Sequence, residues 1–326
     1  MTAAPKIIVT RRLPAAVEVA LREQFDVELA AEDRASTAEV LQRALGRCDG
    51  LLSTVTDRLT AEVLAAYPLQ TRIIANFGVG YDNIDIAAAQ AHDIVVTNTP
   101  DVLTDSTADL AMTLILMTMR RAGEGERDVR AGRWVGWRPT HMMGTQVTGK
   151  TLGLVGMGRI ARALAHRAHH GFGMRILCHD PAPPAPADLA ALGAEPRSTL
   201  DQLLAESDVV SLHCPSTAAT RGLINAPRLA RMKPRSFLIN TARGDIVDDG
   251  ALIDALASGR LAGAGLDVFK GEPNIDRRYL ALENVVLLPH LGSATRETRD
   301  AMGFRAIENL KAFFAGEPVP DRVGYQ

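Results

Sequence analysis

The sequence is poor in features that mark several other classes of protein. Its 326 residues include three cysteines, Cys48, Cys178 and Cys214, which lie far apart and show no CxxC or Cys/His ligand spacing. A disulfide framework or a structural zinc site is therefore not expected, and we expect no metal site. Neither low complexity nor a clear internal repeat is visible.

Long apolar runs and blocks of basic residues are also missing. The apolar stretch 110–119 is far too short to span a bilayer, and residues 1–10 lack the basic and apolar regions of a secretory signal. The formal net charge is −2, the pI is near 6.5, and no Lys/Arg cluster suggests nucleic acid or a membrane surface. We expect a cytoplasmic protein whose partner is a small molecule.

What is present indicates two α/β domains. A chain of this length exceeds one ordinary core, and 47% apolar residues with 23% charged residues can fill two. Short β-rich runs alternate with helical patterns, as in open parallel sheets. Strands are predicted at 6–10, 50–53, 71–75 and 94–97, and then at 151–155, 175–178, 209–213, 236–240, 261–266 and 285–288.

Helices and turns separate these two sets of strands. Helices are predicted at 14–24, at 105–119 and at 295–315, where the last is expected to pack back across the first domain. A turn at 98–101 marks a domain boundary near residue 100. Residues 181–186, with four prolines, are predicted to form a surface loop.

A glycine-rich turn at 153–161 has the GxGxxG/A pattern between a predicted strand and a predicted helix. Gly156 would make the tight turn, Gly158 would let a pyrophosphate approach the backbone, and small Ala161 would let helix and strand pack closely. Asp180 lies 22 residues beyond Gly158, at the end of the next strand. This context predicts a dinucleotide site.

Asp180 also favours NAD over NADP, because a carboxylate accepts from a ribose 2′-hydroxyl and repels a 2′-phosphate. His179 beside it could sit near a phosphate, but it is interpreted as an exposed residue at a strand end. His166, His169 and His170 are assigned to the following helix and its C-terminal end, with no catalytic role.

Three further segments supply an arginine, carboxylates and a histidine, each beside a strand-like run: 239–244, 265–273 and 288–293. Each is unremarkable alone, since an Arg-Gly after a strand is usually a turn and a Pro-His pair is usually structural. Downstream of a dinucleotide turn, they are the groups that hydride transfer to a 2-keto acid requires: an anion clamp, a proton donor and a carboxylate that tunes the donor.

With these motifs and those at 9–14, 78–85, 99–108 and 149–161, the chain resembles the D-isomer-specific 2-hydroxyacid dehydrogenases, and among them the glyoxylate/hydroxypyruvate reductase branch. The resemblance spans nearly the whole chain. It implies a flavodoxin-like substrate domain from residues 1–99 and 292–326, and a Rossmann NAD-binding domain from residues 100–291. The active site is expected in a cleft between them.

The resemblance also implies roles for individual residues. Arg243 matches the substrate arginine, Glu272 its acidic partner, and His290 the proton donor. Substrate contacts fall on Val79 and Gly80 through their backbone N–H groups, on Arg243, and on Ser293. Cofactor contacts fall on Thr104, Gly156, Gly158, Arg159, Ile160, Asp180, His213, Cys214, Pro215, Thr241 and Asp267. Asp267 would hold the nicotinamide carboxamide, although without the resemblance it is simply a turn former at a strand end.

Two positions depart from the family pattern. Ala161 replaces the third glycine, which packing tolerates. His141 stands where some glyoxylate/hydroxypyruvate reductases carry a tryptophan that reaches the neighbouring subunit's pocket, so the pocket wall is in question. The resemblance also implies subunit contacts from the helix that begins near residue 105 and from the arm at 134–143, so a homodimer is expected; the sequence itself shows only surplus apolar and aromatic residues there.

The sequence thus predicts an oxidoreductase that reduces glyoxylate or hydroxypyruvate to the D-2-hydroxy acid with NADH, with NADPH as an alternative. Other D-2-hydroxyacid dehydrogenases remain open, of the D-lactate or D-3-phosphoglycerate type, although the long tail common in the latter is absent. A nucleotide-sensing scaffold like the carboxyl-terminal binding protein corepressors is a further alternative, which the short tail disfavours.

Overall fold

The computed structural model describes residues 4–65 and 68–324, which form two compact units. Unit 1 comprises Met1–Leu103 and Ser293–Gln326, and unit 2 comprises Thr104–Gly292. The unit boundaries follow Leu103 and Gly292, whereas the sequence placed them after residues 99 and 291.

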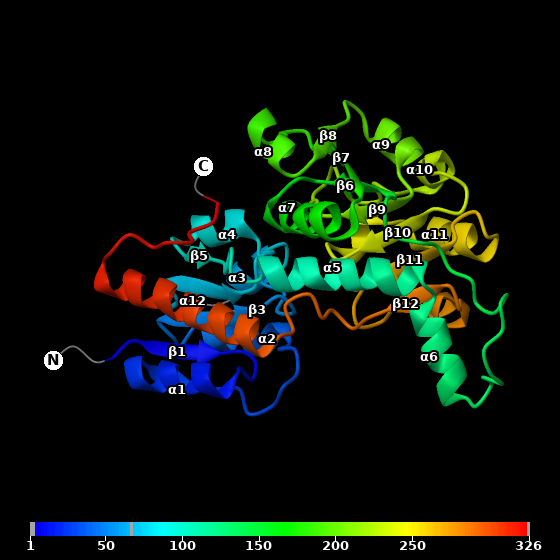
Figure 1. Cartoon of the computed structure of the whole chain (residues 1–326). Coiled ribbons are helices and arrows are strands. Elements are labelled where there is room, and N and C mark those ends of the chain that lie inside the picture. Colours follow the sequence, from blue (N-terminus) through cyan, green and yellow to red (C-terminus); the bar gives the residue numbers. More distant parts are fainter. Residues whose placement is uncertain (1–3, 66–67, 325–326) are drawn as a thin grey trace. The chain divides into compact units, whose positions relative to one another are not determined.

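Unit 1 is built on a parallel sheet of five strands in the order β2-β1-β3-β4-β5 (Figure 1). Its strands are β1 Lys6–Val9, β2 Asp26–Glu28, β3 Gly50–Thr54, β4 Ile73–Phe77 and β5 Val95–Thr97. Its helices are α1 Ala15–Gln24, α2 Ala38–Leu45, α3 Ala61–Ala65, α4 Ile86–Ala91 and α12 Arg296–Ala315.

Both faces of this sheet are covered. Leu41, Leu51 and Ile74 belong to one buried cluster on the α2 side. On the other face α12 packs against β4 and α1, which confirms the predicted return of the last helix. Gly303 is needed there, because a Cβ on it would lie 2.3 Å from a methyl group of Val17.

Unit 2 contains a parallel sheet of seven strands in the order β12-β11-β10-β9-β6-β7-β8. The strands are β6 Thr151–Val155, β7 Arg175–His179, β8 Ala194–Pro196, β9 Val209–Leu212, β10 Phe237–Asn240, β11 Gly263–Leu266 and β12 Val285–Leu287. The helices are α5 Thr104–Met119, α6 Ala122–Arg130, α7 Arg159–His166, α8 Pro186–Ala191, α9 Leu200–Glu206, α10 Ala226–Arg231 and α11 Asp249–Ala257, with a π-helical turn η1 Arg167–Gly171 and 3₁₀ turns η2 Gly244–Ile246 and η3 Arg277–Ala281.

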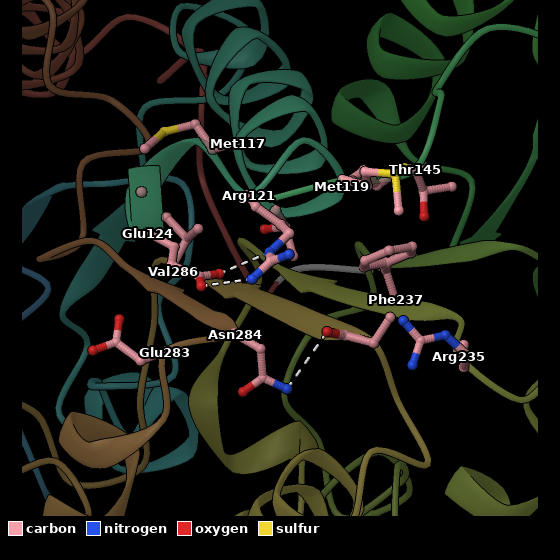
Figure 2. Close-up of a pocket in the computed structure, with 15 residues that line it drawn as sticks. Met117, Met119, Arg121, Glu124, Thr145, Arg235, Phe237, Glu283, Asn284 and Val286 are labelled. Carbon is pink, nitrogen blue, oxygen red and sulfur yellow. Dashed lines mark hydrogen bonds and ion pairs between the residues drawn. The ribbon is translucent and has the colours of Figure 1, made fainter. Parts of the chain in front are cut away.

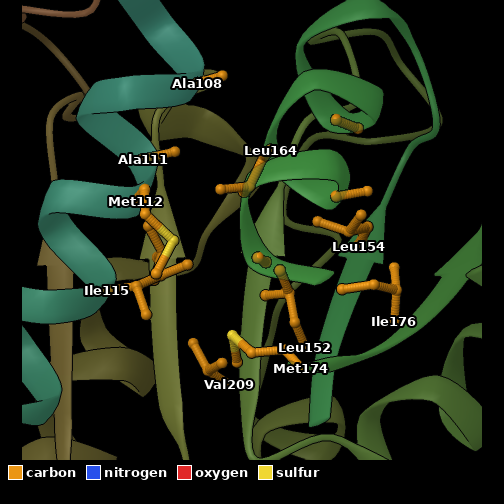
Figure 3. Close-up of a cluster of buried hydrophobic side chains, with 14 of the residues drawn as sticks. Ala108, Ala111, Met112, Ile115, Leu152, Leu154, Leu164, Met174, Ile176 and Val209 are labelled. Carbon is orange, nitrogen blue, oxygen red and sulfur yellow. The ribbon is translucent and has the colours of Figure 1, made fainter. Parts of the chain in front are cut away.

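The long apolar helix α5 lies beside α7 and crosses β10, β11 and β12. Figure 3 shows its residues Ala108, Met112 and Ile115 facing Leu164 of α7 and strand residues such as Leu154. Complete burial of one such aliphatic side chain contributes about 1.5–3 kcal/mol. This packing fixes α7, and therefore the glycine-rich turn before it.

Two α/β units with parallel sheets confirm the predicted fold class. The sequence interpretation missed the edge strands β2 and β8, which have only three residues each and contain no apolar run. Several predicted strand ends differ by one or two residues. The predicted strands began too early at residues 71, 94, 236 and 261, and others ended too late at residues 10, 213 and 288. None of the described helices is both long enough and apolar enough to cross a membrane.

Candidate active site

The sequence order of strands in unit 2 reverses between the central neighbours β6 and β9, and the glycine-rich turn follows β6. In doubly wound folds, ligands bind at such a switch point, beyond the carboxyl ends of the strands. Gly156 has φ of +88°, and a Cβ there would lie 2.9 Å from the Cys214 nitrogen. The turn after β6 therefore packs directly on the segment after β9, and only glycine fits.

Gly158 serves a different purpose. It is the N-cap of α7, and a Cβ built on it meets no atom within 4 Å among the described residues. Space is open above the helix start, and the N–H groups and dipole of a helix N-terminus favour an anion. Arg159 and Ile160 are the first two residues of α7, and the Ile160 side chain packs on the core. The turn fits a pyrophosphate.

Asp180 follows β7, and both of its carboxylate oxygens accept backbone hydrogen bonds. Oδ2 accepts from the Met157 N–H over 2.7 Å, and Oδ1 accepts from the Ala182 N–H over 2.8 Å. Asp180 thus fixes the glycine-rich turn as well as lying at its predicted place. His179 is half-buried rather than exposed, because its Nδ1 lies 3.0 Å from the Arg197 carbonyl oxygen beside the edge strand β8.

The remaining predicted cofactor residues of unit 2 lie at strand or helix ends. Burial lowers the pKa of His213 to about 4, so its ring is neutral near pH 7, and its Nε2 lies 2.9 Å from the Ser211 hydroxyl. Burial raises the pKa of the Cys214 thiol to about 11. Pro215 is exposed, and Thr104 opens α5. The Thr241 hydroxyl is buried and has no partner among the described residues, as expected of a group that awaits a ligand.

Arg243 lies just after β10 on a turn that two neighbours hold. The buried Asn240 side chain donates to the Arg243 carbonyl oxygen over 2.8 Å and accepts from the Ala242 N–H over 3.0 Å. A Cβ on Gly244 would lie 1.9 Å from the Phe269 carbonyl carbon. Gly244 therefore lets the arginine turn touch the backbone of the segment that carries Glu272.

Glu272 divides its carboxylate between its own loop and His290. Oε1 accepts from the Phe269 N–H over 2.7 Å, and Oε2 lies 2.8 Å from His290 Nδ1. Burial opposes ionisation, but the hydrogen bond and charge of His290, with Phe269 N–H and Arg243, outweigh it, so the pKa of Glu272 is lowered. The ionised carboxylate requires a proton on Nδ1, which leaves Nε2 as the outward-facing nitrogen.

The turn that carries His290 is organised by Asp267. The His290 N–H donates to the Asp267 carbonyl oxygen over 2.9 Å. The Asp267 carboxylate accepts from the Leu291 N–H over 2.6 Å and from the Gly292 N–H over 2.9 Å. Three successive N–H groups thus converge on one residue, and His290 adopts a left-handed φ of +55°. Asp267 is 1% exposed, which agrees with the turn-former interpretation, and its carboxamide contact stays a prediction.

The structure therefore brings Arg243, Glu272 and His290 to the carboxyl ends of β10, β11 and β12. Val79, Gly80 and Ser293 belong to unit 1. Sequence reasoning assigned no role to Asn240. A buried asparagine inside an apolar strand is the signal that could have identified it, since such a side chain needs hydrogen-bond partners.

The cavity drawn in Figure 2 lies elsewhere and measures about 270 Å³. Its lining residues Phe237, Ala262 and Asn284 lie at the amino ends of β10, β11 and β12. Figure 2 shows the ion pair between Arg121 and Glu124 and the hydrogen bond that Asn284 donates to the Ala262 carbonyl oxygen. The catalytic candidates follow the opposite ends of these strands, so this cavity is separate from the candidate active site.

Comparisons with known proteins agree with this geometry. Residues 112–292 match the family described as "D-isomer specific 2-hydroxyacid dehydrogenase, NAD binding domain". A glyoxylate reductase of Thermococcus kodakarensis is 46% identical over 323 residues, which cover 98% of this chain and 96% of that protein.

Two solved structures also resemble the chain over nearly its full length. An NADPH-dependent glyoxylate/hydroxypyruvate reductase from Sinorhizobium meliloti, in complex with NADP and malonate, is 36% identical with a TM-score of 0.85, covering 99% of this chain and 97% of its own. A D-mandelate dehydrogenase of Rhodotorula graminis is 28% identical with a TM-score of 0.88, covering 99% of each chain. The chain thus belongs to the D-isomer specific 2-hydroxyacid dehydrogenase family of enzymes and carries that family's NAD-binding domain.

Proposed function

We propose that this enzyme reduces glyoxylate and hydroxypyruvate to the corresponding D-2-hydroxy acids, with NADH as the preferred cofactor. The observation that carries the proposal is the 2.8 Å contact between Glu272 Oε2 and His290 Nδ1. The segment that carries Glu272 also touches the Arg243 turn at Gly244. Relatives named glyoxylate reductase, at 44–46% identity over nearly the whole chain, support the choice of substrate.

The chain's residues would divide the work of reduction as follows. Arg243 binds the substrate carboxylate and polarises the keto group, since a permanently charged planar fork suits both tasks. His290 gives the proton on Nε2 to the carbonyl oxygen as the C=O double bond becomes a C–O single bond. Glu272 keeps Nδ1 protonated and stabilises the charged ring. When bound, the nicotinamide would supply the hydride for the keto carbon. His290 would then be reprotonated from solvent.

The cofactor would be held along the carboxyl ends of β6, β7, β9 and β10. Gly156, Gly158, Arg159 and Ile160 would face the pyrophosphate, and Asp180 the adenosine ribose. Thr104, His213, Cys214, Pro215, Thr241 and Asp267 complete the proposed set. The open space over Gly158 and the unpartnered Thr241 hydroxyl support this assignment.

The substrate proposal is tested with a panel of keto acids at fixed NADH. Glyoxylate and hydroxypyruvate are expected to give the highest kcat/KM. Phosphohydroxypyruvate should be poor, because no additional phosphate-binding block is visible in the sequence. A kcat/KM for phosphohydroxypyruvate far above both would refute the assignment, and cofactor binding without turnover of any keto acid would favour a nucleotide-sensing scaffold.

The preference for NADH is expected to depend on the charge of Asp180. Asp180→Asn removes the charge that repels a 2′-phosphate, but its single side-chain oxygen can accept from only one of the Met157 and Ala182 N–H groups. The ratio of kcat/KM for NADH to kcat/KM for NADPH should fall about tenfold or more, because the loss of about 1.4 kcal/mol of repulsion corresponds to a factor of ten. Asp180→Ala should relax the preference as well.

Asp201→Asn, on the surface of α9, is the matched control and should leave the cofactor ratio unchanged. Equal kcat/KM for the two cofactors in the unmodified enzyme would contradict the role given to Asp180.

Glu272 is expected to set the pH range of reduction. The lowered pKa of Glu272 keeps it charged near neutrality, where it favours the protonated His290. Glu272→Gln removes the carboxylate that accepts from His290 Nδ1 and stabilises the charged ring. The alkaline limb of kcat/KM is therefore expected to move to lower pH.

Glu283→Gln serves as control, because Glu283 pairs with Arg127 at the other end of the sheet. If the alkaline limb does not move in Glu272→Gln while chemistry limits the rate, then Glu272 does not tune His290 and the proposed role of Glu272 is wrong.

We further propose that the enzyme is a homodimer of the cytoplasm. Large apolar side chains between α6 and β6 are exposed, with Val135 at 78% and Trp137 at 83%. Exposed apolar groups this close together are typical of subunit interfaces. His141, by contrast, lies 3.8 Å from Asp128 of its own chain. Sedimentation equilibrium would distinguish a dimer from a monomer.

A further inference from the structure

We propose that Asn76 and Asn98 are positioning residues that hold the loop 78–80 so that the Val79 and Gly80 N–H groups are available to the substrate carboxylate. The inference rests on the proposed function. All of the residues concerned belong to unit 1. The two asparagines would act on substrate only through the loop backbone.

Asn76 holds the two ends of the loop. It lies within β4 and is 0% exposed. Its Nδ2 donates to the Gly80 carbonyl oxygen over 2.8 Å and to the Gly78 carbonyl oxygen over 3.4 Å, while the Gly78 N–H donates to the Asn76 carbonyl oxygen over 2.9 Å. Its Oδ1 is buried with no partner among the described residues. An apolar residue would suit the strand better, so the loop explains the asparagine.

Asn98 holds the middle of the loop. It follows β5 and is 9% exposed, and its Nδ2 donates to the Val79 carbonyl oxygen over 2.8 Å. Asn98 is itself fixed, because its N–H donates to the Asp321 carbonyl oxygen and its carbonyl oxygen accepts from the Asn309 side chain of α12. Asn309 also donates to the Asp321 carboxylate over 2.9 Å. The loop is thus tied to the last helix.

The carbonyl oxygens of residues 78, 79 and 80 all accept hydrogen bonds, and the Thr99 N–H adds one more to that of Gly78. By contrast, the N–H groups of Val79 and Gly80 have no acceptor among residues 4–65 and 68–324. Both residues are half-buried. Backbone donors that are partly shielded from water need an acceptor, and successive N–H groups form a concave site for an anion.

Gly78 completes the geometry, since a Cβ there would lie 2.4 Å from a methyl group of Val55. The loop therefore approaches the segment after β3 closely, and its backbone is fixed by contacts on several sides. A loop already in the binding conformation loses little entropy when the carboxylate arrives. Without the two amides, that ordering would have to occur on binding.

The test uses Asn98→Ala and Asn76→Ala in the full-length enzyme. We expect the KM for glyoxylate and the Ki of oxalate, a carboxylate that is not reduced, to rise together by about 10- to 100-fold, because charge-assisted hydrogen bonds to the loop are weakened. The kcat should change less than about threefold, and the Kd for NADH should be unchanged. Asn98→Ser, which keeps a hydroxyl donor, should recover part of the loss.

Asn284→Ala is the matched control. The Asn284 Nδ2 also bridges two backbone carbonyl oxygens, of Leu256 and Ala262, but at the amino ends of the unit 2 strands. It should lower stability without moving KM or Ki. Should Asn76→Ala not fold, Asn98→Ala decides the matter, because Asn98 lies outside the strands.

A folded Asn98→Ala enzyme with unchanged KM and Ki would overturn the inference, as would an equal loss in kcat and NADH affinity. Failure of the unmodified enzyme to reduce any keto acid would instead refute the proposed function.

Discussion

Replacing His290 with asparagine is expected to lower kcat for keto acid reduction by about 10²-fold or more, while the Kd for NADH stays nearly unchanged. A positioned proton donor acts in the transition state, and its removal typically costs about 10²- to 10⁴-fold. His290 is held for this role by Glu272 at Nδ1 and by the Asp267 turn at its backbone. Stopped-flow measurement of a single turnover isolates the chemical step.

Asparagine is chosen because His290 has a left-handed φ of +55°. Asparagine tolerates this conformation, whereas alanine pays roughly 1–2 kcal/mol for it. His290→Ala should therefore be less stable than His290→Asn but equally slow in the chemical step. If His290→Asn kept most of the rate of the unmodified enzyme while His290→Ala did not, His290 would serve to hold its turn rather than to donate a proton.

Replacing Arg243 with alanine is expected to lower kcat/KM by about 10²- to 10⁴-fold, with contributions from both KM and kcat. Two charge-assisted hydrogen bonds to a carboxylate contribute about 1.5–3 kcal/mol each, and each 1.4 kcal/mol corresponds to a factor of ten. The turn itself should survive, because Asn240 and Gly244 hold it through the backbone.

Arg243→Lys separates charge from shape. Lysine keeps the positive charge but loses the planar fork, so an intermediate loss is expected. Steady-state kinetics with glyoxylate, together with NADH titration, measure both variants. Unchanged KM and kcat in Arg243→Ala would mean that another residue binds the substrate carboxylate.

The family, the two α/β units and most strands could be predicted because the governing signals are local. Apolar runs such as β6 and β10 sit between turn residues, and the glycine-rich turn lies between a strand and a helix. The edge strands β2 and β8 could not be predicted, because three residues without an apolar run carry no periodicity and owe their conformation to neighbouring strands.

The supporting contacts of the site were beyond the sequence for a different reason. His290 and Glu272 are 18 residues apart, and their pairing followed from chemistry and resemblance. The hydrogen bonds of Asn240 to the Arg243 turn, and of Asn98 to Val79, depend on tertiary approach. Only the presence of asparagine beside apolar strand residues hints at them.

The most direct test of the central claim is a single turnover with hydroxypyruvate and NADH deuterated at the transferable position of C4. We expect deuterium at C2 of D-glycerate, with the rate falling about 10²-fold or more in His290→Asn at unchanged NADH affinity. Solvent hydrogen at C2, the L-isomer, or an unaltered rate in His290→Asn would contradict the account.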